Sequence, residues 1–272
     1  MNKTTRYSYQ AAAYILTFMV IQMACTALTM LFFKGNIKEA VPMIISSAAS
    51  SAATIALYAW LRWSPPSRKY INTRPWGTLF WAACLSIGSV VPASLLQEGL
   101  GLELPETYAK MFTGIMSNDW GYLCIGLLVP VAEEMVFRGA VLRKLLCISG
   151  NRLRWASIAA SALLFAIFHG NMAQGVNAFL LGLILGWLYT RTGSIVPGIV
   201  FHWMNNTCAF ATFRLMPGTA DMTVTQFYGG DVVKISLATV CSLAIFFAAL
   251  YQLRTRLPKD GFKNTVEPDR QR

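Results

Sequence analysis

Long apolar runs follow one another through this sequence, and they limit the folds that it can adopt. Eight of them are long enough, or nearly so, to cross the roughly 30 Å hydrocarbon core of a bilayer. The runs cover residues 9–33, 41–61, 76–96, 120–137, 155–169, 176–189, 195–213 and 232–253. Because a backbone inside lipid must satisfy its own hydrogen bonds, each run is expected to be a helix. The predicted fold class is therefore all-α: a polytopic membrane protein built as a bundle of about eight transmembrane helices.

The composition indicates the same class of protein. Only 13% of the residues are charged and 55% are hydrophobic, whereas an average soluble domain has about 25% charged residues. We expect a single integral-membrane domain over residues 1–257, whose first run is an uncleaved anchor, and a polar, disordered tail over residues 258–272. The six cysteines are scattered without a CxxC pair, so we expect free buried thiols rather than a disulfide framework.

The basic residues are distributed unevenly among the connections between the runs. Most Lys and Arg residues lie near the N-terminus, within residues 62–74 and 138–154, at Arg191 and in the tail, while the alternate connections hold most of the acids. The positive-inside rule assigns the basic set to the cytoplasm. We expect a multi-pass protein of a bacterial cytoplasmic membrane, with both termini cytoplasmic and membrane lipids around it. The net charge of +11 then reflects topology, and no nucleic-acid partner is expected.

Three local patterns concern how the helices pack. Gly182 and Gly186 form a GxxxG pattern, which lets two helices approach closely. Apolar residues recur at helical spacing within residues 102–119, which predicts a short amphipathic helix on the outer surface. The fifth and sixth runs are the shortest, so they are expected to be short tilted helices or a pair that dips into the membrane and returns.

The stretch VAEEMVFRGA at residues 131–140 places three charges at the end of an apolar run. Each charge at the centre of a membrane helix costs about 2.5–3.5 kcal/mol on insertion scales, so the cluster needs a reason. Glu134 and Arg138 are spaced i,i+4 with the acid first, which favours an ion pair, whereas Glu133 points about 100° away around the helix. We therefore expect a structural Glu134–Arg138 pair and a separate, reactive Glu133. Pro130 is expected to leave a helix carbonyl free.

The two histidines of the chain also fall in apolar runs. His169 follows Phe165 by about one helical turn, and His202 precedes Asn206 by about one turn on another helix. Taken singly, a Glu–Arg pair in a membrane is sometimes only a contact between helices, and a lone His there is more often a packing or hydrogen-bonding residue than a catalyst. Together they favour hydrolysis: Glu133 takes a proton from water, His169 orients that water or shuttles the proton, and His202 and Asn206 donate hydrogen bonds to the oxyanion.

The same residues allow a second mechanism. Glu133, His169 and His202 could hold a zinc ion that activates the water, since two imidazoles and a carboxylate are a common catalytic zinc set. Spacing does not choose between the two, because the residues lie on different helices. Both mechanisms require the two histidines to lie at a similar depth in the membrane. At 1.5 Å per residue, however, His202 lies about 11 Å from the cytoplasmic end of its run and His169 about 21 Å from the cytoplasmic end of its own run. They meet only if the fifth run begins in the headgroup layer or is strongly tilted.

At these residues the sequence resembles the CPBP family, the CAAX-protease and bacteriocin-processing membrane proteins that include the Ras-converting CAAX endopeptidase. The family pattern is EExxxR, then FxxxH, then HxxxN or HxxxB, each on its own membrane helix. Here the three motifs read Glu133-Glu134-Met135-Val136-Phe137-Arg138, Phe165 to His169, and His202 to Asn206. The resemblance covers residues 120–208, and all three motifs match in order.

The resemblance implies a helical bundle enclosing a polar intramembrane cavity that opens towards the cytoplasm. It implies an intramembrane endopeptidase that cuts membrane-associated proteins or peptides. Its catalytic residues would be Glu133, His169, His202 and Asn206, supported by Glu134, Arg138 and Phe165. The family's need for a metal is unsettled, so zinc is one option rather than a requirement. Other functions stay open: a non-catalytic immunity or interaction protein of the same fold, an ion-coupled transporter, or a bis-histidine haem protein.

Overall fold

The chain folds into helices. A computed structural model describes residues 2–34, 39–65, 67–149, 152–216, 218–219, 222–259 and 261–262, and no strand occurs among them. The longer helices are α1 (Lys3–Phe32), α2 (Ala40–Trp60), α4 (Trp76–Gly99), α5 (Glu106–Ser117), α9 (Arg154–Ile167), α10 (Met172–Thr192), α11 (Val196–Leu215) and α13 (Val232–Arg256). Two short helices, α3 (Arg68–Asn72) and α12 (Val224–Phe227), lie in connections.

One further helical segment runs without a break through residues 119–149. It consists of α6 (Asp119–Gly121), the π-helix η1 (Tyr122–Leu128), α7 (Val129–Glu134), the π-helix η2 (Met135–Leu142) and α8 (Arg143–Ser149). We call this segment the motif helix, because it carries the EExxxR motif.

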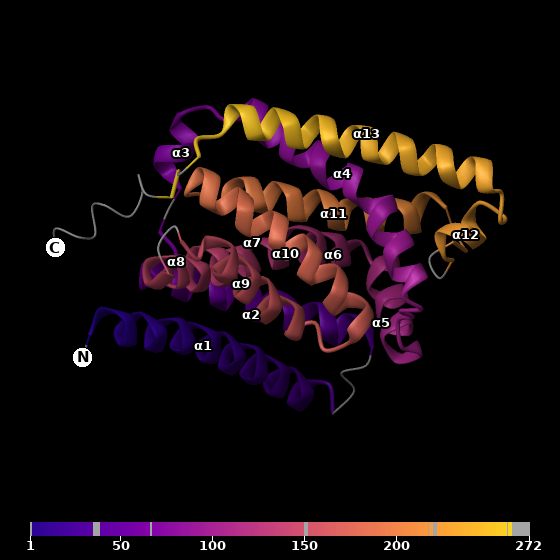
Figure 1. The fold of residues 1–272 in the computed structure, drawn as a ribbon. Coiled ribbons are helices and arrows are strands. Elements are labelled where there is room, and N and C mark those ends of the chain that lie inside the picture. The colour runs from indigo at the N-terminus through magenta and orange to yellow at the C-terminus, as the bar shows by residue number, and fades with distance from the viewer. Residues whose placement is uncertain are drawn as a thin grey trace.

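The helices form layers that enclose the motif helix. In Figure 1, α4 and α13 lie at the top, α11 lies below them, and α2 and α1 lie at the bottom. The pairs α4–α13, α4–α11, α9–α10 and α1–α2 pack directly on one another. The start of α1 and the end of α13 lie at the same end of the molecule (Figure 1).

The main core is centred on the motif helix. Val136, Phe137, Ala140 and Val141 have no exposed surface, and buried residues of α1, α2, α4, α9, α10, α11 and α13 belong to the same cluster. A side chain on this part of the motif helix is therefore surrounded by other helices. The fold carries the motif's charges into the protein interior, away from lipid.

All eight predicted runs coincide with helical segments. Among the described residues, five helices are long and apolar enough to cross a membrane, namely α1, α2, α4, α10 and α13, and α9 is a shorter apolar helix. The chain is thus an all-α, polytopic membrane protein, as predicted. The number of crossings stays a prediction at eight.

The structure corrects the predicted segmentation in three places. The fourth run was expected to end at residue 137, with Arg138 opening a cytoplasmic connection, but the motif helix continues to Ser149 and Arg138 has no exposed surface. The sixth run is longer than expected, because α10 begins at Met172, four residues before the predicted start, where the side-chain oxygen of Asn171 accepts a hydrogen bond from Gln174 N–H. Within the predicted disordered tail, Phe262 N–H donates to Thr190 C=O at 3.1 Å, while residues 260 and 263–272 lie outside the described residues.

Two packing predictions are confirmed. At Gly182 and Gly186, α10 approaches α9 so closely that added Cβ atoms would lie 2.8 Å from Ala162 Cβ and 2.7 Å from Ile158 Cγ2. The amphipathic helix is α5, which packs on α2 and α11 and buries Ile115.

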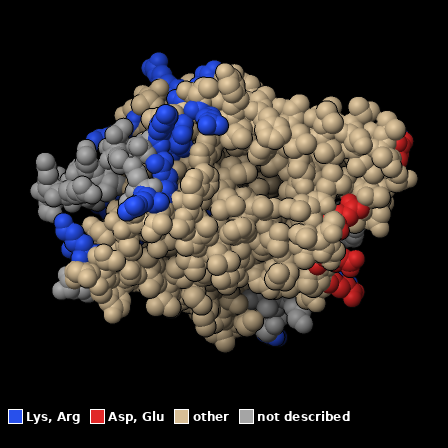
Figure 2. All heavy atoms as spheres, in the orientation of Figure 1, with Lys and Arg blue, Asp and Glu red and all other residues tan. Residues whose placement is uncertain are grey.

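The charged residues separate towards the two ends of the molecule. Figure 2 shows Lys and Arg gathered at the end where α1 begins and α13 ends, and Asp and Glu at the opposite end. The face between them is free of exposed charge in this view (Figure 2). A molecule with an uncharged belt between two charged ends suits a membrane.

Candidate active site

Two π-helices flank the adjacent glutamates of the motif helix. At the end of η1, Val129 N–H donates to Cys124 C=O, five residues back, and η2 begins directly after Glu134. π-helical turns are rare and occur frequently at functional sites. The sequence did not reveal them, because an α-turn and a π-turn can bury the same apolar residues.

The predicted Glu134–Arg138 pair is present and completely buried. Arg138 Nη1 lies 2.7 Å from Glu134 Oε1, with side-chain exposures of 1% and 0%. The guanidinium carbon also lies 4.5 Å from the centroid of the Phe165 ring, a cation–π distance. Phe165 therefore joins α9 to the ion pair, as a supporting residue would.

Two glycines on neighbouring helices make room for this pair. A Cβ at Gly198 of α11 would lie 2.7 Å from Glu134 Oε2, and one at Gly182 of α10 would lie 3.3 Å from Arg138 Nη2. A larger residue at either position would force the ion pair to shift.

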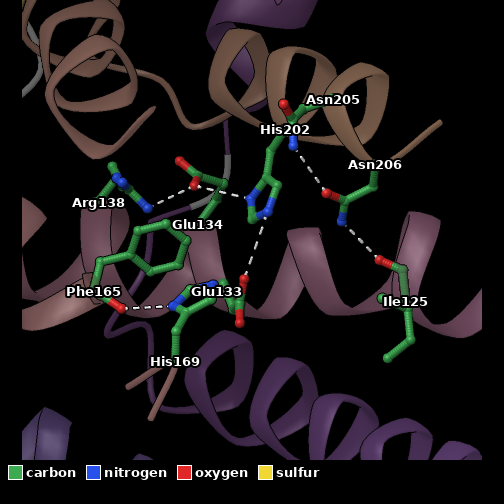
Figure 3. Close-up of polar contacts among 9 residues, drawn as sticks. All are labelled: Ile125, Glu133, Glu134, Arg138, Phe165, His169, His202, Asn205 and Asn206. Carbon is green, nitrogen blue, oxygen red and sulfur yellow. Dashed lines mark hydrogen bonds and ion pairs between the residues drawn. The ribbon is translucent and has the colours of Figure 1, made fainter. Parts of the chain in front are cut away.

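Glu133 differs from Glu134 in both exposure and partners. Its side chain is 19% exposed, and its Oε2 lies 3.7 Å from His202 Nε2. The other imidazole nitrogen, His202 Nδ1, lies 3.5 Å from Glu134 Oε1. The ring of His202 is thus placed between the two carboxylates, one buried and one reachable (Figure 3).

The two histidines meet around Phe165. Its ring centroid lies 4.8 Å from that of His169 and 5.8 Å from that of His202, with both pairs close to perpendicular. His169 follows the end of α9, where its Nδ1 lies 2.9 Å from Phe165 C=O. The difference in depth along the two runs therefore does not keep the imidazoles apart.

Asn206 is fixed from two sides. Its Nδ2 donates to Ile125 C=O of η1 at 2.9 Å, and Asn205 Nδ2 donates to its Oδ1 at 3.3 Å (Figure 3). At the following residue of α11, Tyr122 OH lies 3.1 Å from Thr207 Oγ1. The sequence reasoning missed Asn205, Tyr122 and the Ile125 carbonyl, because backbone groups and contacts between distant segments leave no local pattern.

The residues do not form a ready metal site. No group of three His, Cys, Asp or Glu side chains in the described part of the chain is arranged to hold a metal ion. Glu133 and His202 approach each other, but His169 does not complete a three-ligand set with them. We therefore derive no step through zinc, which stays an untested option.

Comparisons with known proteins identify the same region. The family model for type II CAAX prenyl endopeptidases of the Rce1-like kind matches residues 117–208. The chain is also similar to the membrane-embedded CAAX protease MroQ of Staphylococcus aureus (strain USA300), with 28% identity over 142 residues, which is 51% of this chain and 57% of that protein. No solved structure matches the chain at a comparable level.

The family-model match contains all three motifs, whose residues lie together in the interior of a helical, multi-pass membrane protein. Residues 117–208 are thus similar to the Rce1-like CAAX prenyl endopeptidases, and the chain is similar to a membrane-embedded CAAX protease.

Proposed function

We propose that this protein is an intramembrane endopeptidase that hydrolyses peptide bonds of membrane-associated proteins or peptides. One observation carries the proposal: a partly reachable carboxylate, Glu133, lies 3.7 Å from an imidazole nitrogen of His202 deep in a helical bundle. Charged groups at such a depth are costly and are generally functional. The similarity of residues 117–208 to Rce1-like CAAX prenyl endopeptidases, and of the chain to a CAAX protease, supports a protease.

In the proposed reaction, Glu133 removes a proton from a water molecule, and His169 orients that water or shuttles the proton. The water oxygen attacks the carbonyl carbon of the scissile bond. Nε2 of His202 and Nδ2 of Asn206 donate hydrogen bonds to the resulting oxyanion. When the tetrahedral intermediate collapses, the C–N bond breaks and the proton held by Glu133 passes to the leaving amine.

The buried pair supports these groups without touching the substrate. Arg138 holds Glu134, whose Oε1 also faces His202 Nδ1. Fixed groups of this kind keep catalytic side chains in place, which is a large part of enzymatic rate enhancement.

We further propose that the basic end faces the cytoplasm of a bacterial cell, as the positive-inside rule predicts. Both termini then lie in the cytoplasm, lipids surround the bundle, and the polar cavity opens towards that side. The substrate would approach from there.

The test compares cells that produce the wild-type chain with cells that produce Glu133→Gln, which keeps the size of the side chain but removes the base. Peptides in the membrane fraction and in the medium are identified by mass spectrometry. Cleavage products present in wild type should fall by about 10²–10⁴-fold in Glu133→Gln, as for the loss of a general base. Glu106→Gln is the control, because Glu106 is exposed on α5.

Full cleavage in Glu133→Gln would contradict the proposal. A Glu133→Gln phenotype equal to wild type, alongside a distinct deletion phenotype, would instead indicate a non-catalytic membrane protein.

A further inference from the structure

The carbonyl of Ile125 has lost the donors that a helix would provide. In a π-turn the donor to Ile125 C=O would be the N–H of residue 130, but Pro130 has no N–H. The donor for an α-turn would be Val129 N–H, and that group donates to Cys124 C=O. Without another donor, the Ile125 carbonyl would be an unpaired polar group in a membrane protein, where an unpaired group costs several kcal/mol.

Asn206 supplies the missing donor from a different helix. Its Nδ2 lies 2.9 Å from Ile125 O, and Asn205 Nδ2 donates to its Oδ1. The oxygen and one N–H of the Asn206 amide are therefore both held by hydrogen bonds. Because the amide group is planar, the second N–H of Nδ2 can then point in only one direction.

Neighbouring contacts hold the same turn of α11 against η1. Trp203 Nε1 donates to Tyr122 OH at 2.9 Å, and Tyr122 OH also contacts Thr207 Oγ1. Farther along the motif helix, Glu134 faces His202. The motif helix thus contacts both polar residues of the HxxxN motif, His202 through a carboxylate and Asn206 through a backbone carbonyl.

We propose that Pro130 is a positioning residue: by freeing the Ile125 carbonyl, it fixes the Asn206 amide in the orientation that donates to the oxyanion. This inference rests on the proposed function and deepens it. Pro130 does not touch the substrate, and it acts only through Asn206.

The test uses purified full-length protein and a substrate peptide taken from the cleavage products described above. Pro130→Ala restores a backbone N–H that competes for Ile125 C=O. We expect kcat to fall about tenfold, with KM unchanged, since removing a whole oxyanion donor costs about 10²–10³ in kcat. Pro92→Ala is the matched control, because Pro92 also lies inside a helix, α4, and is not part of the motif helix. In an Asn206→Ala background, Pro130→Ala should have no further effect on kcat.

A second measurement does not depend on activity. Asn206→Ala should lower Tm by several degrees in the wild-type chain, where it leaves the carbonyl unpaired, and clearly less in Pro130→Ala, where the new N–H serves that carbonyl. Additive Tm shifts, or a Pro130→Ala enzyme with wild-type kcat, would overturn the inference. If the wild-type protein cleaves nothing while the Tm shifts remain coupled, the proposed function fails and the Pro130–Asn206 coupling stands.

Discussion

The buried Glu134–Arg138 pair allows a sharp test of what holds this bundle together. We consider Arg138→Met, which keeps a long side chain but removes the guanidinium. Glu134 has no exposed surface, and its Oε2 has no hydrogen-bond partner among the described residues. Breaking one side of such a pair leaves a buried charge uncompensated, which typically costs about 3–5 kcal/mol. At about 2–4 °C per kcal/mol for a chain of this size, Tm should fall by about 6–20 °C.

The chain contains a matched control with the same spacing. Lys110 and Glu106 form an i,i+4 pair at 2.6 Å on α5, with side-chain exposures of 76% and 81%. An exposed helical pair of this kind contributes about 0.3–0.5 kcal/mol. Lys110→Met should therefore lower Tm by no more than about 2 °C.

The double variant Glu134→Gln/Arg138→Met separates loss of charge balance from loss of packing. It removes both charges, so it should unfold at a higher temperature than Arg138→Met alone. Thermal unfolding in detergent, followed by circular dichroism, provides the measurement. If Arg138→Met does not accumulate, recovery of folded protein in the double variant gives the same information. The reasoning is refuted if Arg138→Met and Lys110→Met lower Tm equally, or if the double variant is the least stable.

Three further predictions follow from the site and the charge distribution. Gly198→Ala places a methyl group 2.7 Å from Glu134 Oε2 and should lower kcat about tenfold or more, because small misplacements of catalytic groups are costly; Gly99→Ala, whose Cβ meets nothing within 4 Å, should cleave at the wild-type rate. Cleavage should persist in EDTA, since the described His and Glu residues form no three-ligand group; loss of cleavage that zinc restores would contradict this. In a background without native cysteines, an impermeant maleimide applied to intact cells should label Glu103→Cys but not Lys69→Cys, and the opposite pattern would reverse the topology.

The features that the sequence predicted correctly depend on short stretches of chain. The Glu134–Arg138 ion pair could be predicted from its i,i+4 spacing once the segment was known to be a helix. The long apolar runs predicted that helix, because a backbone in lipid must satisfy its own hydrogen bonds. The pair is present at 2.7 Å, and helices occupy all the predicted runs.

The features that it missed depend on how separate segments meet. Arg138 was counted with the surface charges, because the sequence does not show that α9, α10 and α11 cover it. The position of His202 between Glu133 and Glu134 could not be predicted, since it requires the relative rotation of two helices. Pro130 did predict a free carbonyl, but nothing in the sequence indicated that Asn206 would bind it.

The π-helices also determine which changes of length the chain tolerates. A π-turn holds about one residue more than an α-turn, because its hydrogen bonds join residues i and i+5 rather than i and i+4. Deleting one residue within η1 would therefore return the segment to ordinary α-helical geometry and leave Glu133 and Glu134 facing nearly the same neighbours. A deletion within α7 would instead turn everything after it by about 100° relative to the residues before it. In this protein, the motif helix should accept the loss of one residue in η1 more readily than the loss of one in α7, so its length carries information that its composition does not.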